Sequence, residues 1–268
     1  MLQRETTAGV LRFRLSNKIF GQGGYFTACY WVDGLLIDSG CAHTARELDA
    51  ALADHRLQQI VNTHSHEDHF GGNARLVRRH GARVLAHPAG LEVMAAPRRH
   101  LKMQLYRHVF WGVPERSLGE RIGEVVHTKH HRFEVIATPG HSVDHIALFE
   151  RERGWLFTGD AFVGGRDRAL RGSADVRLII DSMETMAALD ARLMFVGSGR
   201  VYQEPSAQLQ VKIDYLRELG ERIMRLRRRG ASVSRIHRLL FKRRPFVSYL
   251  TSGDFTGEHL VRSYLQSE

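Results

Sequence analysis

The sequence contains few cysteines and no long apolar run. Its 268 residues include two cysteines, Cys29 and Cys41, which are too few for a disulfide framework and lack the spacing of a cysteine metal cluster. No segment approaches the roughly 18 uninterrupted apolar residues of a membrane-spanning helix. The first residues, MLQRETTAGVLRFRL, lack the apolar core of a secretion signal. We therefore expect a cytoplasmic protein with no membrane segment.

Motifs of several other enzyme classes are also absent. The chain has no Gly-x-Ser-x-Gly elbow and no Walker loop, and residues 197–199 (GSG) are too short for either. Residues 21–24 (GQGG) precede a strand pattern rather than a helix, so they do not predict a dinucleotide site. Catalysis by a serine elbow or a phosphate-binding loop is therefore not expected.

The composition is that of a globular protein whose positive charge lies mainly at one end. The chain is 43% hydrophobic and 25% charged, with a formal net charge of +10. Its length suits one large domain or one domain with an appendage. Residues 206–268 hold 13 Lys and Arg against 6 Asp and Glu. This positive surplus can attract nucleic acid or an acidic substrate, or it can be the solvated face of helices, and both interpretations stay open.

The apolar pattern of residues 1–205 alternates between strands and helices. We expect an extended run from Phe13, a hairpin over 25–38 that turns at Asp33-Gly34, a helix over 42–55, a strand over 59–62, a helix over 73–80 and a strand over 83–86. Further on we expect strands over 123–128, 133–138, 145–150 and 155–158, a helix over 181–192 and a strand over 193–196. Residues 97–114 predict a helical insertion that could cover a cleft.

After Pro205 the pattern is helical throughout. Apolar side chains recur every three or four residues in one stripe: Leu209, Ile213, Leu216, Leu219, Ile223 and Leu226. Such a stripe must be buried, either against the outer face of the preceding domain or against a second subunit. Two shorter helices are expected near 232–241 and 256–265. The chain is thus expected to have two parts, residues 1–205 and a basic helical extension over 206–268.

The strongest signal for chemistry lies in residues 64–69, which read HSHEDH. This segment follows an apolar strand pattern and brings together three imidazoles and the carboxylate of Asp68. A loop at a strand end can turn these side chains towards one or two common points. Imidazole and carboxylate ligands suit zinc, with iron(II) and manganese as alternatives. We therefore expect a site for one or two metal ions.

This segment resembles the HxHxDH signature of the metallo-β-lactamase superfamily, and three further segments resemble other motifs of that family in the right order. They are residues 38–40 (DSG), 138–142 (TPGHS) and 158–160 (TGD). The resemblance implies an α/β fold, an αβ/βα sandwich of two mixed β-sheets flanked by helices, with metals at one edge. Residues 139–148 (PGHSVDHIAL), together with the helical, basic C-terminal part, look like the glyoxalase-II-like and lactamase-beta-2-like branches, which act on thioesters, lactones or RNA phosphodiesters.

The resemblance also implies a role for each motif residue. His64, His66 and His141 would bind the first ion, and Asp68, His69 and Asp160 the second, with Asp160 bridging. Asp38 would hold the ligand loops by hydrogen bonds. His145, four residues after His141, is expected behind the ligands or at the rim of the site.

The sequence departs from the family at the last motif. The family usually has Gly-His-Gly there, and that histidine completes the second metal site, whereas this chain has Ser198 between two glycines. A neutral hydroxyl is a poor ligand beside an imidazole. We therefore expect the second position to be incompletely occupied. His43 could compensate, or it could be a surface residue at the start of a helix.

These residues predict a metal-dependent hydrolase of an ester, thioester, lactone or phosphodiester. The metal would lower the pKa of water from about 15.7 towards about 7, and Asp68 would orient that water or accept its proton. Two alternatives stay open: a ligand-binding or sensing protein on a degenerate hydrolase scaffold, suggested by Ser198, and a nuclease acting on RNA. The expected partner is a small-molecule substrate, with nucleic acid at the basic extension and a second copy of the chain as alternatives.

Overall fold

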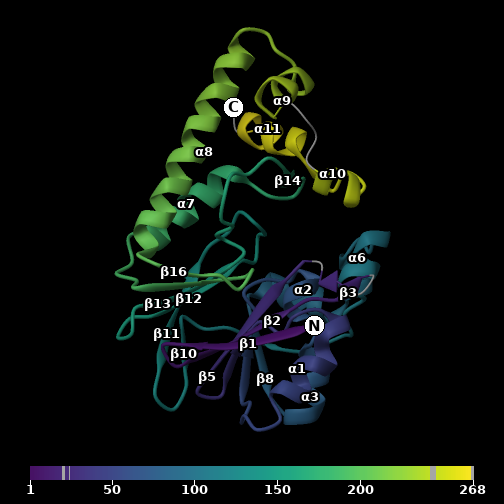
Figure 1. Ribbon diagram of the computed structural model, residues 1–268, viewed down its shortest axis with the longest axis vertical. Coiled ribbons are helices and arrows are strands. Elements are labelled where there is room, and N and C mark those ends of the chain that lie inside the picture. The colour runs from purple at the N-terminus through teal and green to yellow at the C-terminus, as the bar shows by residue number, and fades with distance from the viewer. Residues whose placement is uncertain (20–21, 24, 242–245, 267–268) are drawn as a thin grey trace.

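The computed structural model describes residues 1–19, 22–23, 25–241 and 246–266 (Figure 1). Its strands are β1 Leu2–Thr7, β2 Val10–Leu15, β3 Lys18–Ile19, β4 Gln22–Gly23, β5 Thr27–Val32, β6 Leu35–Ile37, β7 Gln59–Val61, β8 Arg83–Ala86, β9 Glu120–Arg121, β10 Val125–His127, β11 Arg132–Ala137, β12 Ile146–Glu150, β13 Trp155–Gly159, β14 Leu170–Arg171, β15 Leu193–Val196, β16 Val201–Gln203 and β17 Phe255–Thr256. Its helices are the 3-10 helix η1 Ala42–Thr44 and α1 Ala45–Ala51, α2 Glu67–Phe70, α3 Asn73–His80, α4 Pro88–Ala95, α5 Pro97–His100, α6 Leu105–Phe110, α7 Val176–Ala187, α8 Pro205–Arg228, α9 Val233–Phe241, α10 Phe246–Leu250 and α11 Gly257–Leu265.

Two large mixed sheets form the centre of the molecule. Within the described residues, one has seven strands in the order β1-β2-β5-β6-β7-β8-β9, and the other has six in the order β10-β11-β12-β13-β15-β16. Strands β6 to β9 run parallel, as do β13 and β15, whereas the other neighbours in these sheets are antiparallel. Figure 1 shows α1 and α3 beside the first sheet and α7 and α8 beside the second.

Alternating side chains distribute each central strand over two layers of the core. In β6, Leu35 and Ile37 are buried between the sheets, whereas Leu36 packs with the residues of α1 and α3. In β12, Leu148 is buried between the sheets, whereas Phe149 packs with the residues of α7 and α8. This alternation follows from the two-residue period of a strand. The expected αβ/βα sandwich is confirmed.

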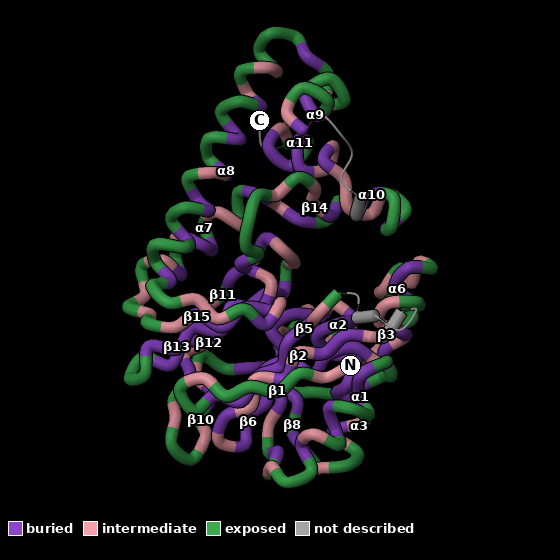
Figure 2. The backbone as a smooth tube through the Cα atoms, in the orientation of Figure 1, coloured by how far each residue is buried: buried purple, intermediate pink, exposed green. Residues whose placement is uncertain are grey.

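The expected helical extension after Pro205 is also present, and its apolar stripe is buried inside the chain. Five residues of the stripe are at most 4% exposed: Leu209, Ile213, Leu216, Leu219 and Ile223. They share one hydrophobic cluster with Phe149 of β12 and Met183 of α7. Figure 2 shows buried residues along one side of α8 and exposed residues along the other. The stripe therefore packs inside the chain, against α7 and, farther along α8, against α9 and α11, and the boundary at residue 205 stays a prediction.

Two elements differ from the expectation. Helix α7 begins five residues before the expected helix over 181–192, because the carboxylate of Asp175 accepts the backbone N–H groups of Arg177 and Leu178 and starts the helix there. The expected helical insertion over 97–114 consists of two short helices, α5 and α6.

One small sheet had no signal in the sequence. Strand β14 pairs with β17, so that Leu170 lies opposite Thr256 and Arg171 opposite Phe255. This pairing returns the C-terminal segment to the loop that follows Asp160. No helix in the described part of the chain is long and apolar enough to cross a membrane.

Candidate metal centre

The candidate ligands lie where strands end. Strand β7 leads into residues 62–69, β11 and β12 are joined by residues 138–145, and β13 ends beside Asp160. The HSHEDH segment is extended at His66 (φ −76°, ψ 145°) and then turns into the short helix α2. This change of backbone conformation turns the second half of the segment away from the direction of the first.

Three imidazoles form a first group of possible ligands. Nδ1 of His66 lies 3.0 Å from Nε2 of His64 and 3.0 Å from Nε2 of His141. Ligands about 2.0–2.1 Å from a tetrahedral zinc ion lie roughly 3.3 Å apart, which matches this spacing. Burial holds the pKa values of His64 and His66 well below their ordinary value and lowers the pKa of His141 to about 4. The rings are therefore neutral at pH 7, as metal binding by imidazole requires.

Hydrogen bonds determine which nitrogen of His64 carries the proton. Oγ1 of Thr63 donates to Oδ2 of Asp38 at 2.9 Å, so it accepts from Nδ1 of His64 at 3.0 Å. Nε2 of His64 then keeps its lone pair and faces the other two histidines. This buried relay prepares His64 to bind a cation.

A second group consists of His64, His69 and Asp160. Nε2 of His69 lies 3.5 Å from Oδ2 of Asp160 and 3.8 Å from Oδ2 of Asp68. This buried nitrogen makes no hydrogen bond of ordinary length, while Nδ1 of the same ring donates to Asp38 at 2.8 Å. Because buried polar atoms are nearly always satisfied, the free Nε2 fits a bound cation.

The charges around this second group also fit a cation. Burial by itself lowers the pKa of His69, but Asp38 and Asp160 outweigh it and raise that pKa well above its ordinary value. Burial raises the pKa of Asp68 to about 6. Although burial also raises the pKa of Asp160, the neighbouring His69 holds it well below its ordinary value. Several buried carboxylates around one imidazole are costly without further positive charge, which a divalent ion would supply.

Asp38 supports the HSHEDH segment from behind. Its carboxylate accepts the backbone N–H of Thr63 at 2.8 Å, in addition to the hydroxyl of Thr63 and the ring of His69. The residue adopts a left-handed backbone conformation (φ 59°) directly after β6. These contacts agree with the supporting role predicted for Asp38.

His145 is buried behind the candidate ligands rather than at a rim. Its Nε2 accepts the backbone N–H of Asp160 at 3.1 Å, and its Nδ1 therefore donates to Oγ1 of Thr138 at 2.8 Å. Its ring also stacks on the ring of His64, with centroids 4.8 Å apart. Both ring nitrogens are used, so His145 holds the loop of Asp160 and the ring of His64 in place.

The turn that carries Ser198 runs beside Asp160. A Cβ atom on Gly197 would lie 2.1 Å from Oδ1 of Asp160 and 3.1 Å from the backbone of Gly159, so a larger residue here would displace the Asp160 carboxylate. Ser198 is half-buried, and its carbonyl accepts a hydrogen bond from Nε of Arg14 at 3.3 Å.

His43 is exposed, and its Nε2 lies 2.7 Å from the carbonyl oxygen of His108. That contact supports the interpretation of His43 as a surface residue at a helix start.

Sequence reasoning missed a buried network directly behind the HSHEDH segment. Glu67 is fully buried, and its carboxylate accepts Nη1 of Arg107 at 3.0 Å. Nη2 of Arg107 donates to Asp254 at 2.9 Å, and the hydroxyl of Tyr106 donates to the same carboxylate at 2.5 Å. Nothing in the sequence indicated that residues so far apart would meet, although Glu67 lies inside the motif. The network ties the motif to α6 and to the C-terminal segment.

A cavity of about 310 Å³ opens beside both groups of possible ligands. His66, Asp68, His141 and Asp160 form part of its lining. The insertion over 97–114 supplies Tyr106, Phe110 and Trp111, which agrees with the expectation that it covers a cleft. The remaining walls come from Tyr25, the segment after Asp160, and the residues around β14, α10 and β17.

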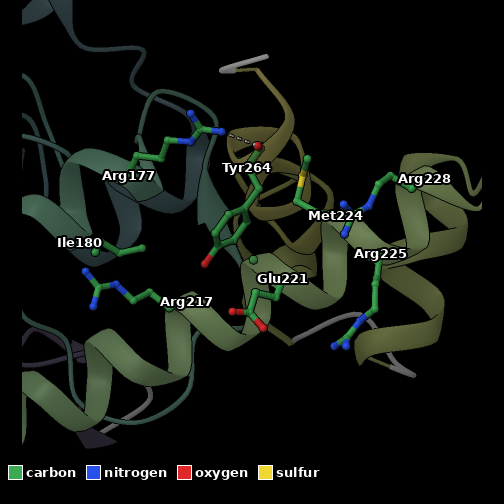
Figure 3. A pocket seen from close by; sticks show the side chains of 9 residues that line it. Arg177, Ile180, Arg217, Glu221, Met224, Arg225, Arg228 and Tyr264 are labelled. Atoms are coloured by element: carbon green, nitrogen blue, oxygen red, sulfur yellow. Dashed lines mark hydrogen bonds between the residues drawn. The ribbon is translucent and has the colours of Figure 1, made fainter.

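A second hollow, of about 520 Å³, lies between α7, α8 and α11 and shares no lining residue with the first (Figure 3). Four arginines line it: Arg177, Arg217, Arg225 and Arg228. Two of them have partners, because Arg177 donates to the carbonyl of Tyr264 and Arg217 pairs with Glu184. Arginines at the C-terminal end of α8 also interact favourably with the helix dipole. The basic run at 242–244 lies outside the described residues, so its part in one patch with Arg222–Arg229 stays a prediction.

The sequence matches the family model of the metallo-beta-lactamase superfamily over residues 23–198. It is 31% identical over 182 residues to a hydroxyacylglutathione hydrolase of Methylococcus capsulatus, which covers 66% of this chain and 62% of that protein. It is 34% identical over 158 residues to the hydroxyacylglutathione hydrolase of Pseudomonas aeruginosa, which covers 58% of this chain and 52% of that protein. The chain thus spans less than two thirds of the length of these curated relatives.

Solved structures of similar fold extend over nearly the whole chain. A metallo-beta-lactamase family protein from Thermus thermophilus superposes with a TM-score of 0.69 at 20% identity, covering 97% of this chain and 94% of that one. A beta-lactamase domain protein from Burkholderia ambifaria superposes with a TM-score of 0.64 at 19% identity, covering 100% of this chain and 87% of that one. At these identities the likeness concerns the fold alone.

Proposed function

The chain belongs to the metallo-beta-lactamase superfamily, and from this membership we propose that it is a metal-dependent hydrolase of thioesters. The observation that carries the proposal is that two groups of possible ligands share His64, and that the second contains the unpartnered Nε2 of His69. The curated relatives named hydroxyacylglutathione hydrolase point to a thioester as the substrate class. Retention of both groups argues against a scaffold that has lost its metal.

We assign His64, His66 and His141 to one ion and Asp68, His69 and Asp160 to a second. Zinc is the proposed ion because the first set is made of nitrogen ligands, with iron(II) and manganese as alternatives. A bound divalent ion supplies Lewis acidity, which polarises a carbonyl oxygen and makes water nucleophilic near neutral pH. Ser198 leaves the second position one imidazole short of the family pattern.

The residues of the chain orient the reactants and move the proton. Asp68 lines the pocket, where it orients the attacking water and accepts its proton. The water oxygen bonds to the thioester carbon, the carbon–sulfur bond breaks, and the departing thiolate takes up the proton. Asp38 and His145 keep His69 and the loop of Asp160 in position.

The substitution His66→Ala tests the proposal, because Nδ1 of His66 lies within 3.0 Å of both other imidazoles of the first group. Metal content is measured by elemental analysis, and thioester hydrolysis is followed by release of free thiol. We expect the variant to lose the metal and the turnover, while the exposed His100→Ala keeps both. Unchanged turnover in His66→Ala, or no hydrolysis of any thioester by the metal-loaded protein, would refute the proposal.

A further inference from the structure

The pocket beside the metal centre has an apolar rim that the solvent reaches. Three large apolar side chains of its lining are strongly exposed: Tyr25 at 48%, Val163 at 49% and Leu250 at 40%. Single exposed apolar residues are common, but a group of them around one concave site marks a place where a ligand buries apolar surface. We therefore expect an apolar part of the substrate to bind at this rim.

One wall of this pocket consists of aromatic side chains that pack against one another. The ring of Trp111 meets the rings of Tyr25, Tyr106 and Phe110, with centroids 6.2, 5.7 and 6.2 Å apart. The contacts with Tyr25 and Tyr106 are edge-to-face, which is a favourable arrangement for aromatic side chains. Phe255 of β17 also lines the pocket, and the guanidinium of Arg171 lies over its ring, 4.9 Å from the ring centroid. An aryl or branched aliphatic group could contact several of these aromatic side chains.

Away from the proposed metal ligands, the charged side chains of the described pocket lining have partners of opposite charge. Asp68 and Asp160 belong to the proposed metal site, and the carboxylate of Asp167 pairs with Nζ of Lys212 at 2.7 Å. Nε of Arg171 lies 3.6 Å from the carboxylate of Asp254, which already offsets part of its charge. A glutathione carrier has two carboxylates and would find few cations here. The polar carrier of a thioester therefore stays outside, and the acyl group enters.

We propose that this pocket binds the acyl part of the thioester and selects a bulky, uncharged, apolar acyl group over a small hydroxyacyl group. This inference rests on the proposed function and narrows its substrate. The volume of about 310 Å³ lies at the lower end of the range for small-molecule sites, which leaves room for a bulky acyl group. Tyr25, Trp111, Leu250 and Phe255 are the residues that determine the selection.

The experiment compares thioesters that share one small neutral thiol, N-acetylcysteamine, and differ in the acyl group. We expect kcat/KM for the phenylacetyl thioester to exceed that for the lactoyl thioester by about tenfold or more, since apolar contacts in a pocket discriminate at this level. Binding of the non-hydrolysable thioether S-(2-phenylethyl)-N-acetylcysteamine, measured by calorimetry with and without metal, reports the pocket independently of turnover.

Two variants localise the effect without disturbing the core, because Tyr25 and Leu250 are exposed. We expect Tyr25→Ala and Leu250→Ala to raise KM for the phenylacetyl thioester and to weaken thioether binding several-fold. The matched control is Leu239→Ala on α9, a large apolar residue that is 54% exposed and does not line the pocket. It is expected to behave like the unmodified protein.

The outcomes separate this inference from the proposed function. If kcat/KM is higher for the lactoyl thioester and neither variant changes KM, the inference is overturned and the proposed function still stands. If no thioester is hydrolysed, the proposed function fails, and thioether binding then tests whether the pocket is an apolar binding site. Binding that Leu250→Ala weakens supports an apolar site, and absence of binding overturns it.

Discussion

The guanidinium of Arg107 lies 3.0 Å from the carboxylate of Glu67, and both side chains are at most 7% exposed. Glu67 stands between His66 and Asp68 in the chain, whereas Arg107 belongs to the insertion that covers the pocket. The other side of Arg107 donates to Asp254 beside β17. One buried side chain therefore connects the HSHEDH segment, the insertion and the C-terminal segment.

Removing this connection should destabilise the protein strongly. Arg107→Met leaves the carboxylate of Glu67 buried without its partner, which typically costs about 3–5 kcal/mol of the free energy of unfolding. Urea denaturation measures the loss, with Arg98→Met on the exposed side of α5 as the control. The double variant Glu67→Gln/Arg107→Met should recover part of the stability. A single variant within about 0.5 kcal/mol of the unmodified protein would contradict the structural role of the pair.

Asp38→Asn should weaken metal binding rather than abolish folding. The amide keeps the size of the side chain, but it cannot accept from Thr63 and His69 as a carboxylate does. Loss of such a supporting partner typically costs about 10- to 100-fold in metal affinity. Competition with a chromogenic chelator measures the affinity, and the exposed Asp54→Asn is the matched control. If the two variants bind zinc with equal affinity, Asp38 does not hold the candidate ligands in position.

Ser198→His should raise the occupancy of the second metal position. The turn that carries Ser198 runs against Asp160 at Gly197, and the family motif has a histidine at the position of Ser198. A zinc titration followed by elemental analysis should give a higher metal-to-protein ratio than for the unmodified chain, while Ser173→His, at an exposed position, should not. The idea fails if the ratio is the same across the titration, or if the unmodified chain already holds two ions.

Leu216→Ala should show how much α8 contributes to the stability of the whole chain. Leu216 is 1% exposed within the cluster formed by α7, α8 and the second sheet. Truncation of a buried leucine costs about 2–5 kcal/mol. Val211→Ala on the same helix, at a position 71% exposed, should stay within about 0.5 kcal/mol. A loss confined to an early, separate unfolding step would show instead that residues 206–268 unfold as an independent part.

Local patterns predicted most elements and the candidate ligands. The hairpin that turns at Asp33-Gly34 and the helix that ends at Gly81 depend on short-range backbone preferences, and both are present. The apolar periodicity predicts a helix from residue 181, whereas α7 begins at Val176, because the N-cap at Asp175 is a hydrogen-bonding signal that apolar periodicity does not contain. The roles of the motif residues as ligands stay predictions, which the metal measurements test.

The sequence by itself determined the order of the strands and helices and the types of side chain that could bind a metal. These features depend on residues close together in the chain, where periodicity, caps and motif spacing are visible. Only the tertiary structure decided which nitrogen of His69 is free, how Glu67 meets Arg107 and Asp254, and which apolar residues line the pocket. Arg107 is 40 residues from Glu67 and 147 from Asp254 in the chain, and such contacts form because buried charge must be paired and apolar surface must be covered when the layers pack together.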